Sequence, residues 1–215
     1  MNFKIRFLII SAVVILTSCA DRSKKSTCDE CVKIGSQNWA KKNLDVSVFR
    51  NGDPIPEVQS VEEWIEFGKN KRPAWCYSEN IFSNGEKYGK LYNWYAVSDS
   101  RKLAPVGWHI PTDDDWTKLT SYLGGEKDAA EKMKASGEWQ DNCNGTNSSG
   151  FSALPGGGRG NLGWFQDVGS YCGWWSSSDY NPSSGWARVL SCQNEFVERY
   201  QYDKIDGFSI RCLKD

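Results

Sequence analysis

The sequence has little histidine, no excess of charge of either sign, and no hydrophobic run that could span a membrane. His109 is the only histidine among 215 residues, and no Ser-His-Asp or Cys-His pair that includes it can be proposed from the sequence. The formal net charge is −1, which argues against nucleic acid as a partner. The apolar run from Phe7 to Leu16 covers about ten residues, well short of the roughly 20 that a spanning helix needs.

The N-terminus has the pattern of a bacterial lipoprotein signal. Two basic residues precede the apolar run, whose length is typical of a signal-peptide core. Leu16-Thr17-Ser18 then leads into Cys19 and resembles a lipobox, in which cleavage leaves Cys19 as the lipid-bearing N-terminus. We therefore expect residues 1–18 to be removed and residues 19–31 to form an anchor and tether, with the membrane as a partner through the lipid. An ordinary secretory signal with an incidental cysteine is the alternative. The expected location is the outer membrane of the cell envelope, facing either the periplasm or the surface.

Seven further cysteines are consistent with export, because an oxidising compartment favours disulfides. Cys172 and Cys192 lie symmetrically about Pro182, which is in a turn between two predicted strands. A regular hairpin would place them opposite each other, so we predict a Cys172–Cys192 disulfide. Cys28 and Cys31 have redox or metal spacing, but no second pair or nearby histidine completes a zinc site, and a local disulfide is favoured. The pairing of Cys76, Cys143 and Cys212 is left open.

The residue pattern predicts helices early in the chain and strands late. A strand is expected over 32–44. Helices are expected from the N-cap Ser60 to Gly68, over 88–97, from the N-cap Thr112 to Gly124, and over 128–136. Short apolar runs separated by Gly, Asn and Ser predict antiparallel strands near 151–154, 173–178, 185–191, 194–201 and 207–213. This order of elements predicts an α+β fold in one domain.

Ordered motifs give a more specific indication. They are Ile34–Trp39, Lys42–Leu44, Pro73–Tyr77, Tyr88–Trp94, Leu103–Asp113, Ser149–Gly157, Trp174–Ser178 and Gly207–Cys212. In this order and spacing they resemble the Fibrobacter succinogenes major paralogous domain, a family common in exported proteins of Bacteroidetes. We assign residues 32–215 to this domain.

The resemblance implies a loop-rich, C-type-lectin-like fold related to that of formylglycine-generating enzymes. Two or three early helices would pack on a small twisted antiparallel sheet, with the N- and C-terminal strands near each other. It also implies that the usual partner of Cys212 is missing, because Ala104 stands where many members carry a cysteine. The oxidative chemistry of the enzyme branch uses two neighbouring cysteines, whereas Cys192 and Cys212 are far apart in the sequence. We therefore expect this chain to lack that activity.

Residues that could carry chemistry have structural explanations. His109 lies between Trp108 and Ile110, a setting typical of a structural histidine. Asp113 to Asp115 could suggest a cation site, but they occupy the first turn of a predicted helix, where carboxylates cap free N–H groups. Calcium would need about six to eight oxygen ligands. We predict no metal, no cofactor and no catalytic residue, and expect a protein that is not an enzyme.

Aromatic and polar residues in the glycine-rich late region indicate a binding module instead. Exposed tryptophans stack on sugar rings, while Asp, Asn and Arg bind hydroxyl groups or carboxylates. At least one of Trp174 and Trp175 must face the core if both lie in one strand. We expect a glycan or polysaccharide ligand, and the alternative is a protein–protein or adhesion module of a surface assembly. The candidate ligand-binding residues are Arg159, Trp164, Trp175, Asp179, Asn181 and Trp186.

Overall fold

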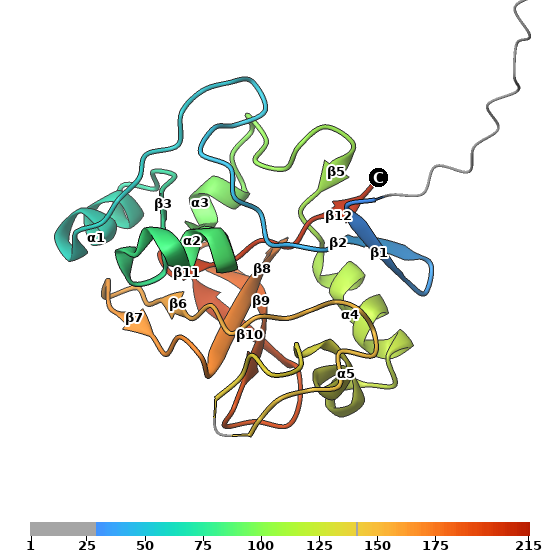
Figure 1. Ribbon diagram of the computed structural model, residues 1–215. Helices are drawn as coiled ribbons and strands as arrows, with labels where there is room; N and C mark the ends of the chain where they lie inside the picture. The colour runs from blue at the N-terminus through green and yellow to red at the C-terminus, as the bar shows by residue number, and fades with distance from the viewer. Residues whose placement is uncertain (1–28, 141) are drawn as a thin grey trace, which may run out of the picture.

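The computed structural model describes residues 29–140 and 142–215 as a mixed α+β fold that is mostly β (Figure 1). The α+β prediction is thus confirmed. The predicted signal sequence, the predicted lipidation site Cys19 and the Cys28 half of the predicted local disulfide lie outside the described residues, while Cys31 is disulfide-bonded. Within the described part of the chain, no helix is long and apolar enough to cross a membrane.

The strands of the described residues form three antiparallel sheets. The first has the order β1 (Cys31–Ile34), β2 (Gln37–Ala40), β12 (Leu213–Lys214), β5 (Trp108–His109). The second has the order β10 (Glu198–Asp203), β9 (Ser184–Ser191), β8 (Tyr171–Asp179). The third has the order β3 (Trp75–Cys76), β4 (Leu91–Asn93), β11 (Gly207–Phe208), β6 (Gly158–Arg159), β7 (Phe165–Gln166).

The first sheet brings the two ends of the domain together, as the family resemblance implies. Leu213 of β12 pairs with Trp39 of β2. The predicted strand over 32–44 is instead a hairpin followed by an irregular segment, because Gly35 turns the chain with φ +60°. The predicted strand over 207–213 is likewise divided between two sheets, and near 151–154 there is only an isolated bridge at Ala153.

The helices of the described residues are α1 (Val61–Lys69), α2 (Phe82–Tyr88), α3 (Trp94–Val97), α4 (Asp113–Tyr122) and α5 (Glu126–Met133), with a 3₁₀ turn at Ser78–Asn80. The two predicted N-caps are confirmed: Ser60 accepts from the Glu63 N–H, and Thr112 forms a capping box with Asp115. The predicted helix over 88–97 is wrong in its first half. Residues 91–93 form β4, where Tyr92 pairs with Phe208, because this long-range pairing outweighs local helical propensity.

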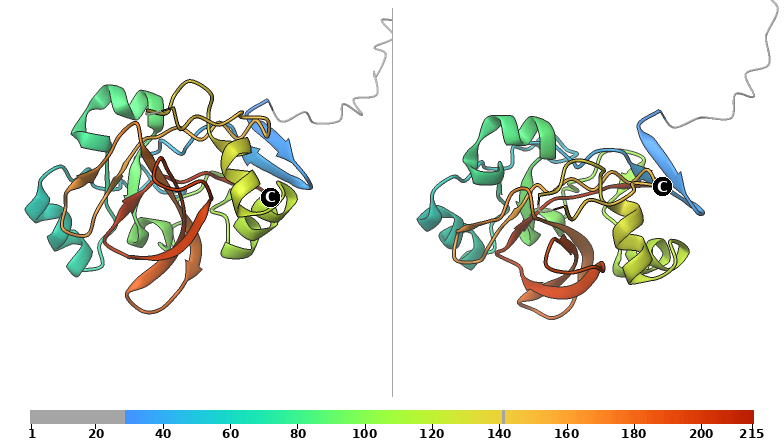
Figure 2. Two further views of the ribbon diagram at one scale, coloured as in Figure 1. Left: turned by 90° about the horizontal axis from the view of Figure 1, so that it is seen from below. Right: turned by 60° about the horizontal axis from the view of Figure 1, so that its bottom comes forward.

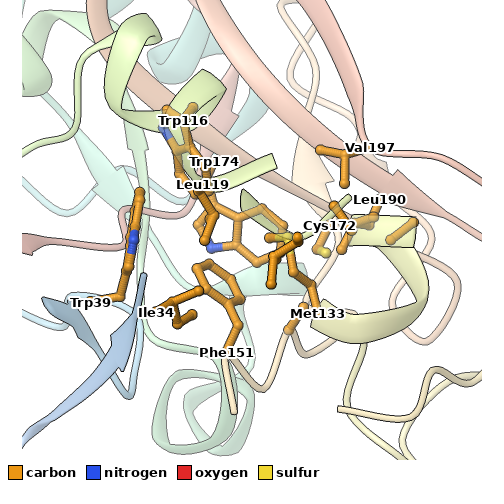
Figure 3. Close-up of a cluster of buried hydrophobic side chains, with 14 of the residues drawn as sticks. Ile34, Trp39, Trp116, Leu119, Met133, Phe151, Cys172, Trp174, Leu190 and Val197 are labelled. Carbon is orange, nitrogen blue, oxygen red and sulfur yellow. The ribbon is translucent and has the colours of Figure 1, made fainter. Parts of the chain in front are cut away.

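Much of the aromatic content forms the core. Trp39 of β2, Trp116 of α4 and Trp174 of β8 meet around Phe151, and all four are completely buried (Figure 3). The ring centroids of Trp39 and Trp116 are 4.7 Å apart, and those of Phe151 and Trp174 are 5.6 Å apart in an edge-on contact. The cluster joins α4 and α5 to strands of two sheets. The β1–β2 hairpin and α1 lie at opposite ends of the molecule (Figures 1 and 2).

The predicted Cys172–Cys192 disulfide is wrong. Cys192 bonds to Cys143, and Cys172 is a free, buried thiol inside the core cluster (Figure 3). The β8–β9 hairpin is not symmetrical about its turn, because a register shift between Trp175 and the turn displaces the pairing. Cys172 therefore lies opposite Leu190 instead of Cys192. The chain has already left β9 at Cys192, where the side chain reaches the loop that carries Cys143.

Candidate functional site

Two of the six predicted ligand-binding residues are core residues. Arg159 is fully buried, and its guanidinium donates to the main-chain carbonyls of four residues while lying 4.5 Å from the Trp64 ring centroid. Trp175 is also fully buried, and its Nε1 donates to the Tyr92 carbonyl at 2.9 Å. Every guanidinium nitrogen of Arg159 has a carbonyl acceptor, and Trp175 is enclosed by the core, so neither side chain is available to a ligand and this part of the prediction is wrong.

Three further predicted residues, Asp179, Asn181 and Trp186, make structural contacts within the β8–β9 hairpin or between it and the β10 region. Asp179 forms an ion pair with the buried Lys204. Asn181 accepts hydrogen bonds from main-chain N–H groups of its own turn, an Asx arrangement. The Trp186 ring is covered by the Arg199 guanidinium, whose carbon lies 3.4 Å from the ring centroid. A sugar could stack on that face of Trp186 only by displacing Arg199.

Trp164 is the sixth predicted residue, and its side chain is largely exposed. It follows the tip of the β6–β7 hairpin and is 69% exposed, and Leu162 beside it is 66% exposed. This hairpin belongs to a different sheet from β8 and β9. The six predicted residues therefore do not form one site.

The acidic first turn of α4 is structural, as predicted. Asp113 accepts from Arg188 Nη1 at 2.7 Å and from Arg199 Nη2 at 2.8 Å. Burial acts to raise the pKa of Asp113, but the hydrogen bonds from Arg199 and Arg188 outweigh it and hold the pKa below its usual value. The Asp115 carboxylate accepts a hydrogen bond from the Thr112 main-chain N–H as part of the capping box of α4. Across residues 29–140 and 142–215, no group of three or more His, Cys, Asp or Glu residues could hold a metal ion.

The structure instead has three adjacent hollows, which we call together the cleft. The central hollow, of about 510 Å³, is lined by residues 40–45 at the end of β2 and after it, by the acidic residues Asp29 and Glu30, and by Pro105, Trp108 and Cys212. The Arg211 hollow, of about 390 Å³, shares Lys41, Lys42, Asn43 and Asp45 with it. The Trp94 hollow, of about 460 Å³, shares Trp108 with the central one. Each volume lies in the range of small-ligand sites.

Asn43 lines both the central hollow and the Arg211 hollow, and three hydrogen bonds fix its side chain between them. Its Oδ1 accepts from Trp174 Nε1 and from Arg211 Nε, both at 2.9 Å, and its Nδ2 donates to the Tyr88 carbonyl at 2.8 Å. The main chain on either side is tied to the C-terminal segment, because the Leu44 N–H donates to the carbonyl of residue 210. The fixed wall presents the exposed Lys41 and Lys42 to both hollows.

Arg211 is a buried cation at the wall of its hollow. The side chain is 1% exposed, and Nη1 donates to the Phe151 carbonyl at 2.6 Å and to the carbonyls of Ala40 and Lys41 at 3.2 and 3.3 Å. Its hydrogen-bond acceptors among the described residues, Asn43 included, are neutral oxygens, and the guanidinium carbon lies 4.5 Å from the Phe151 ring centroid. Burial lowers the pKa of Arg211 to about 10. The guanidinium is still charged at neutral pH.

Trp108 separates the central hollow from the Trp94 hollow and is partly exposed. The Trp94 hollow has polar walls that include His109, whose Nδ1 lies 2.7 Å from Asp215 Oδ1. Trp94 also lines this hollow, but its Nε1 is buried near Gly185 and has no hydrogen-bond partner within the described part of the chain. The cleft thus combines an aromatic ring with amide, carboxylate and ammonium groups.

A family model described as Fibrobacter succinogenes major domain matches residues 32–214. Searches of curated proteins and of solved structures give no match.

Sequence reasoning missed the residues that line the cleft. Asn43 and Arg211 lie in two of the motifs that carry the family resemblance, yet neither motif indicates a role for them. They are 168 positions apart, and only the folded chain brings their side chains together. Trp108 lies in a third of these motifs, Leu103–Asp113, which likewise indicates no role for it. Trp108 is more than sixty positions from Lys41 and Lys42, so these cleft residues form no local sequence pattern.

Proposed function

This chain belongs to the Fibrobacter succinogenes major domain family, and we propose that it is a non-catalytic binding module of the cell envelope whose ligand is a glycan or polysaccharide. The proposal includes a C-type-lectin-like form of the α+β fold and a lipid anchor on Cys19 at the outer membrane. The observation that carries the proposal is the cleft, in which neighbouring hollows share their walls.

The chemistry of the cleft suits a chain of sugar rings. A sugar presents an apolar ring face, which packs on an aromatic side chain, and a rim of hydroxyl groups, which need donors and acceptors. Trp108 supplies the ring between two hollows, and Lys41, Lys42 and Asp45 supply polar groups on the shared wall. A polymer needs several adjacent subsites, so hollows with shared walls favour it over a single small molecule.

The thiols support a role in binding. Cys76, Cys172 and Cys212 are free cysteines of the described residues, and all three are buried. Burial raises the pKa of Cys76 and of Cys212 to about 12, and it raises the pKa of Cys172 as well. Nucleophilic and oxidative cysteine chemistry requires the thiolate, which these environments disfavour at neutral pH.

The test is binding of the full chain to a panel of polysaccharides, with Trp108→Ala compared with Trp164→Ala. We expect at least one polysaccharide to bind and Trp108→Ala to weaken it about tenfold or more, the loss of a central aromatic contact worth about 1.4 kcal/mol. Trp164→Ala is the matched control, because it removes an exposed tryptophan outside the cleft. Circular dichroism checks that both variants fold. Absence of binding at millimolar sensitivity across the panel, or equal binding by wild type and Trp108→Ala, would overturn the proposal.

The second candidate function is a protein–protein or adhesion module. Leu162 and Trp164, two large exposed apolar side chains on one hairpin, favour it. If Trp164→Ala abolishes retention on isolated envelopes while Trp108→Ala has no effect, this function is favoured over glycan binding.

A further inference from the structure

Arg211 differs from two other buried arginines, Arg159 and Arg188, in the groups that accept hydrogen bonds from its guanidinium. Arg188 pairs with a carboxylate, that of Asp113. Arg159 donates from Nε, Nη1 and Nη2 to carbonyl oxygens. Arg211 donates only from Nε and Nη1, and its Nη2 has no acceptor within residues 29–140 and 142–215.

A buried cation without a carboxylate partner is costly, because desolvation removes its favourable interaction with water. Arg211 lines the Arg211 hollow, so an acceptor that enters the hollow can reach this guanidinium. A charged acceptor would restore more of the lost solvation energy than a neutral one, because it adds the Coulomb attraction of an opposite charge to the hydrogen bond. The buried guanidinium therefore favours an anion over a hydroxyl group.

The other charged side chains around the hollow favour an anion as well. Lys41, Lys42 and Lys87 line the hollow with Arg211, against the carboxylates of Asp45 and Glu86. The Asp45 carboxylate is paired with Lys90, a residue outside the lining, and Lys87 is paired with Glu138 at 2.8 Å. Lys42 makes no ion pair or side-chain hydrogen bond among the described residues.

We infer that the Arg211 hollow is an anion subsite that takes a carboxylate or sulfate group carried by an acidic polysaccharide. Lys42 is the exposed cation of its lining, and Arg211 is the buried cation in its wall. The inference rests on the proposed function for the polymer, whose chain continues into the central hollow past Asn43. What the inference adds to the proposed function is that the protein prefers an acidic polysaccharide to a neutral one.

The experiment is isothermal titration of the full chain with polygalacturonate, with dextran sulfate, with neutral dextran and with inorganic sulfate. Lys42→Gln and Arg211→Lys are the test variants. Lys118→Gln is the matched control, a lysine on α4 outside the hollow whose side chain is 67% exposed. We expect an acidic polymer to bind at least about tenfold more tightly than neutral dextran, the size of one lost charge-assisted contact. Lys42→Gln should weaken the acidic polymer about tenfold and Lys118→Gln should not. Lys42→Gln keeps the test valid if Arg211→Lys fails to fold.

The outcomes separate the two claims. Equal affinity for acidic and neutral polymers, unchanged by Lys42→Gln, overturns the anion subsite and leaves glycan binding intact. Binding of inorganic sulfate that depends on Lys42, without binding of any polymer, supports the subsite and overturns the glycan function. If neither inorganic sulfate nor an acidic polymer binds, the anion subsite is refuted.

Discussion

Removal of the Cys143–Cys192 disulfide should lower the free energy of unfolding by about 4 kcal/mol. The bond joins residues 49 positions apart, and the loop-closure entropy of an unfolded chain with a loop of that length corresponds to roughly 4 kcal/mol at 25 °C. The loop between the two cysteines contains all of β8 and β9, so the cross-link restricts the part of the chain that carries Trp174. A loss of this size is a large share of a typical stability of about 5–15 kcal/mol.

The assay is urea unfolding of the double variant Cys143→Ser/Cys192→Ser, followed by tryptophan fluorescence. Buried Trp174 and Trp116 report on the core to which the loop is joined. The double variant avoids an unpaired thiol that could form a new disulfide. The matched control is Cys172→Ala, which removes a buried thiol but leaves the disulfide; it should cost about 1 kcal/mol through the loss of one core atom.

Two results would refute this reasoning. The first is a non-reducing peptide map in which Cys192 is linked to Cys172, since the shifted register of β8 and β9 would then be wrong. The second is a double variant whose free energy of unfolding falls by less than about 1 kcal/mol, because the entropy of a loop this long should cost several times more.

Three further predictions concern stability. Burial, reinforced by the nearby charge of Asp203, raises the pKa of Asp206 from 3.8 to about 7. The folded protein therefore binds this proton more tightly than the unfolded chain, and the free energy of unfolding should fall by about 4 kcal/mol as pH rises from about 3 to about 8. Asp206→Asn, measured by urea unfolding across this range, should remove that fall. Gly173→Ala would place a Cβ 2.6 Å from the buried Phe208 ring and should cost about 1–3 kcal/mol in thermal unfolding. Gly160→Ala, which meets only ordinary contacts, should leave stability unchanged; equal losses in the two variants would contradict the crowding at Gly173. Thr112→Ala should lower the free energy of unfolding by about 1 kcal/mol, because it removes the N-cap of α4, whereas Thr112→Ser keeps the capping hydroxyl. If calorimetry finds the two variants equally stable, the cap does not contribute as stated.

The elements that the sequence predicted correctly are those with local signals. The N-caps at Ser60 and Thr112 act within one helical turn, so three or four residues suffice to predict them. The long strands β8 and β9 have apolar runs bounded by a turn. Short strands with long-range partners were missed, and β4 was mistaken for helix because its pairing with β11 is invisible in the residues around it.

The candidate site was harder to predict than the fold. The sequence indicated that tryptophans and arginines in the late region could bind a ligand, but composition does not distinguish a core tryptophan from an exposed one. Trp175 and Arg159 are in fact completely buried, and Trp164 is exposed. The cleft depends on residues from the two ends of the domain, which become neighbours only when β12 pairs with β2.

By itself the sequence determined the family, the α+β class and the caps of two helices, because these follow from ordered motifs and from contacts within a few residues. The tertiary structure alone decided which cysteines pair, because a single register shift beyond Trp175 moves Cys172 into the core. It also decided that Arg211 lies against Asn43 at the wall of a hollow, where its guanidinium pairs with no carboxylate of the described residues. Long-range packing sets burial and charge compensation, and no local pattern encodes either of them.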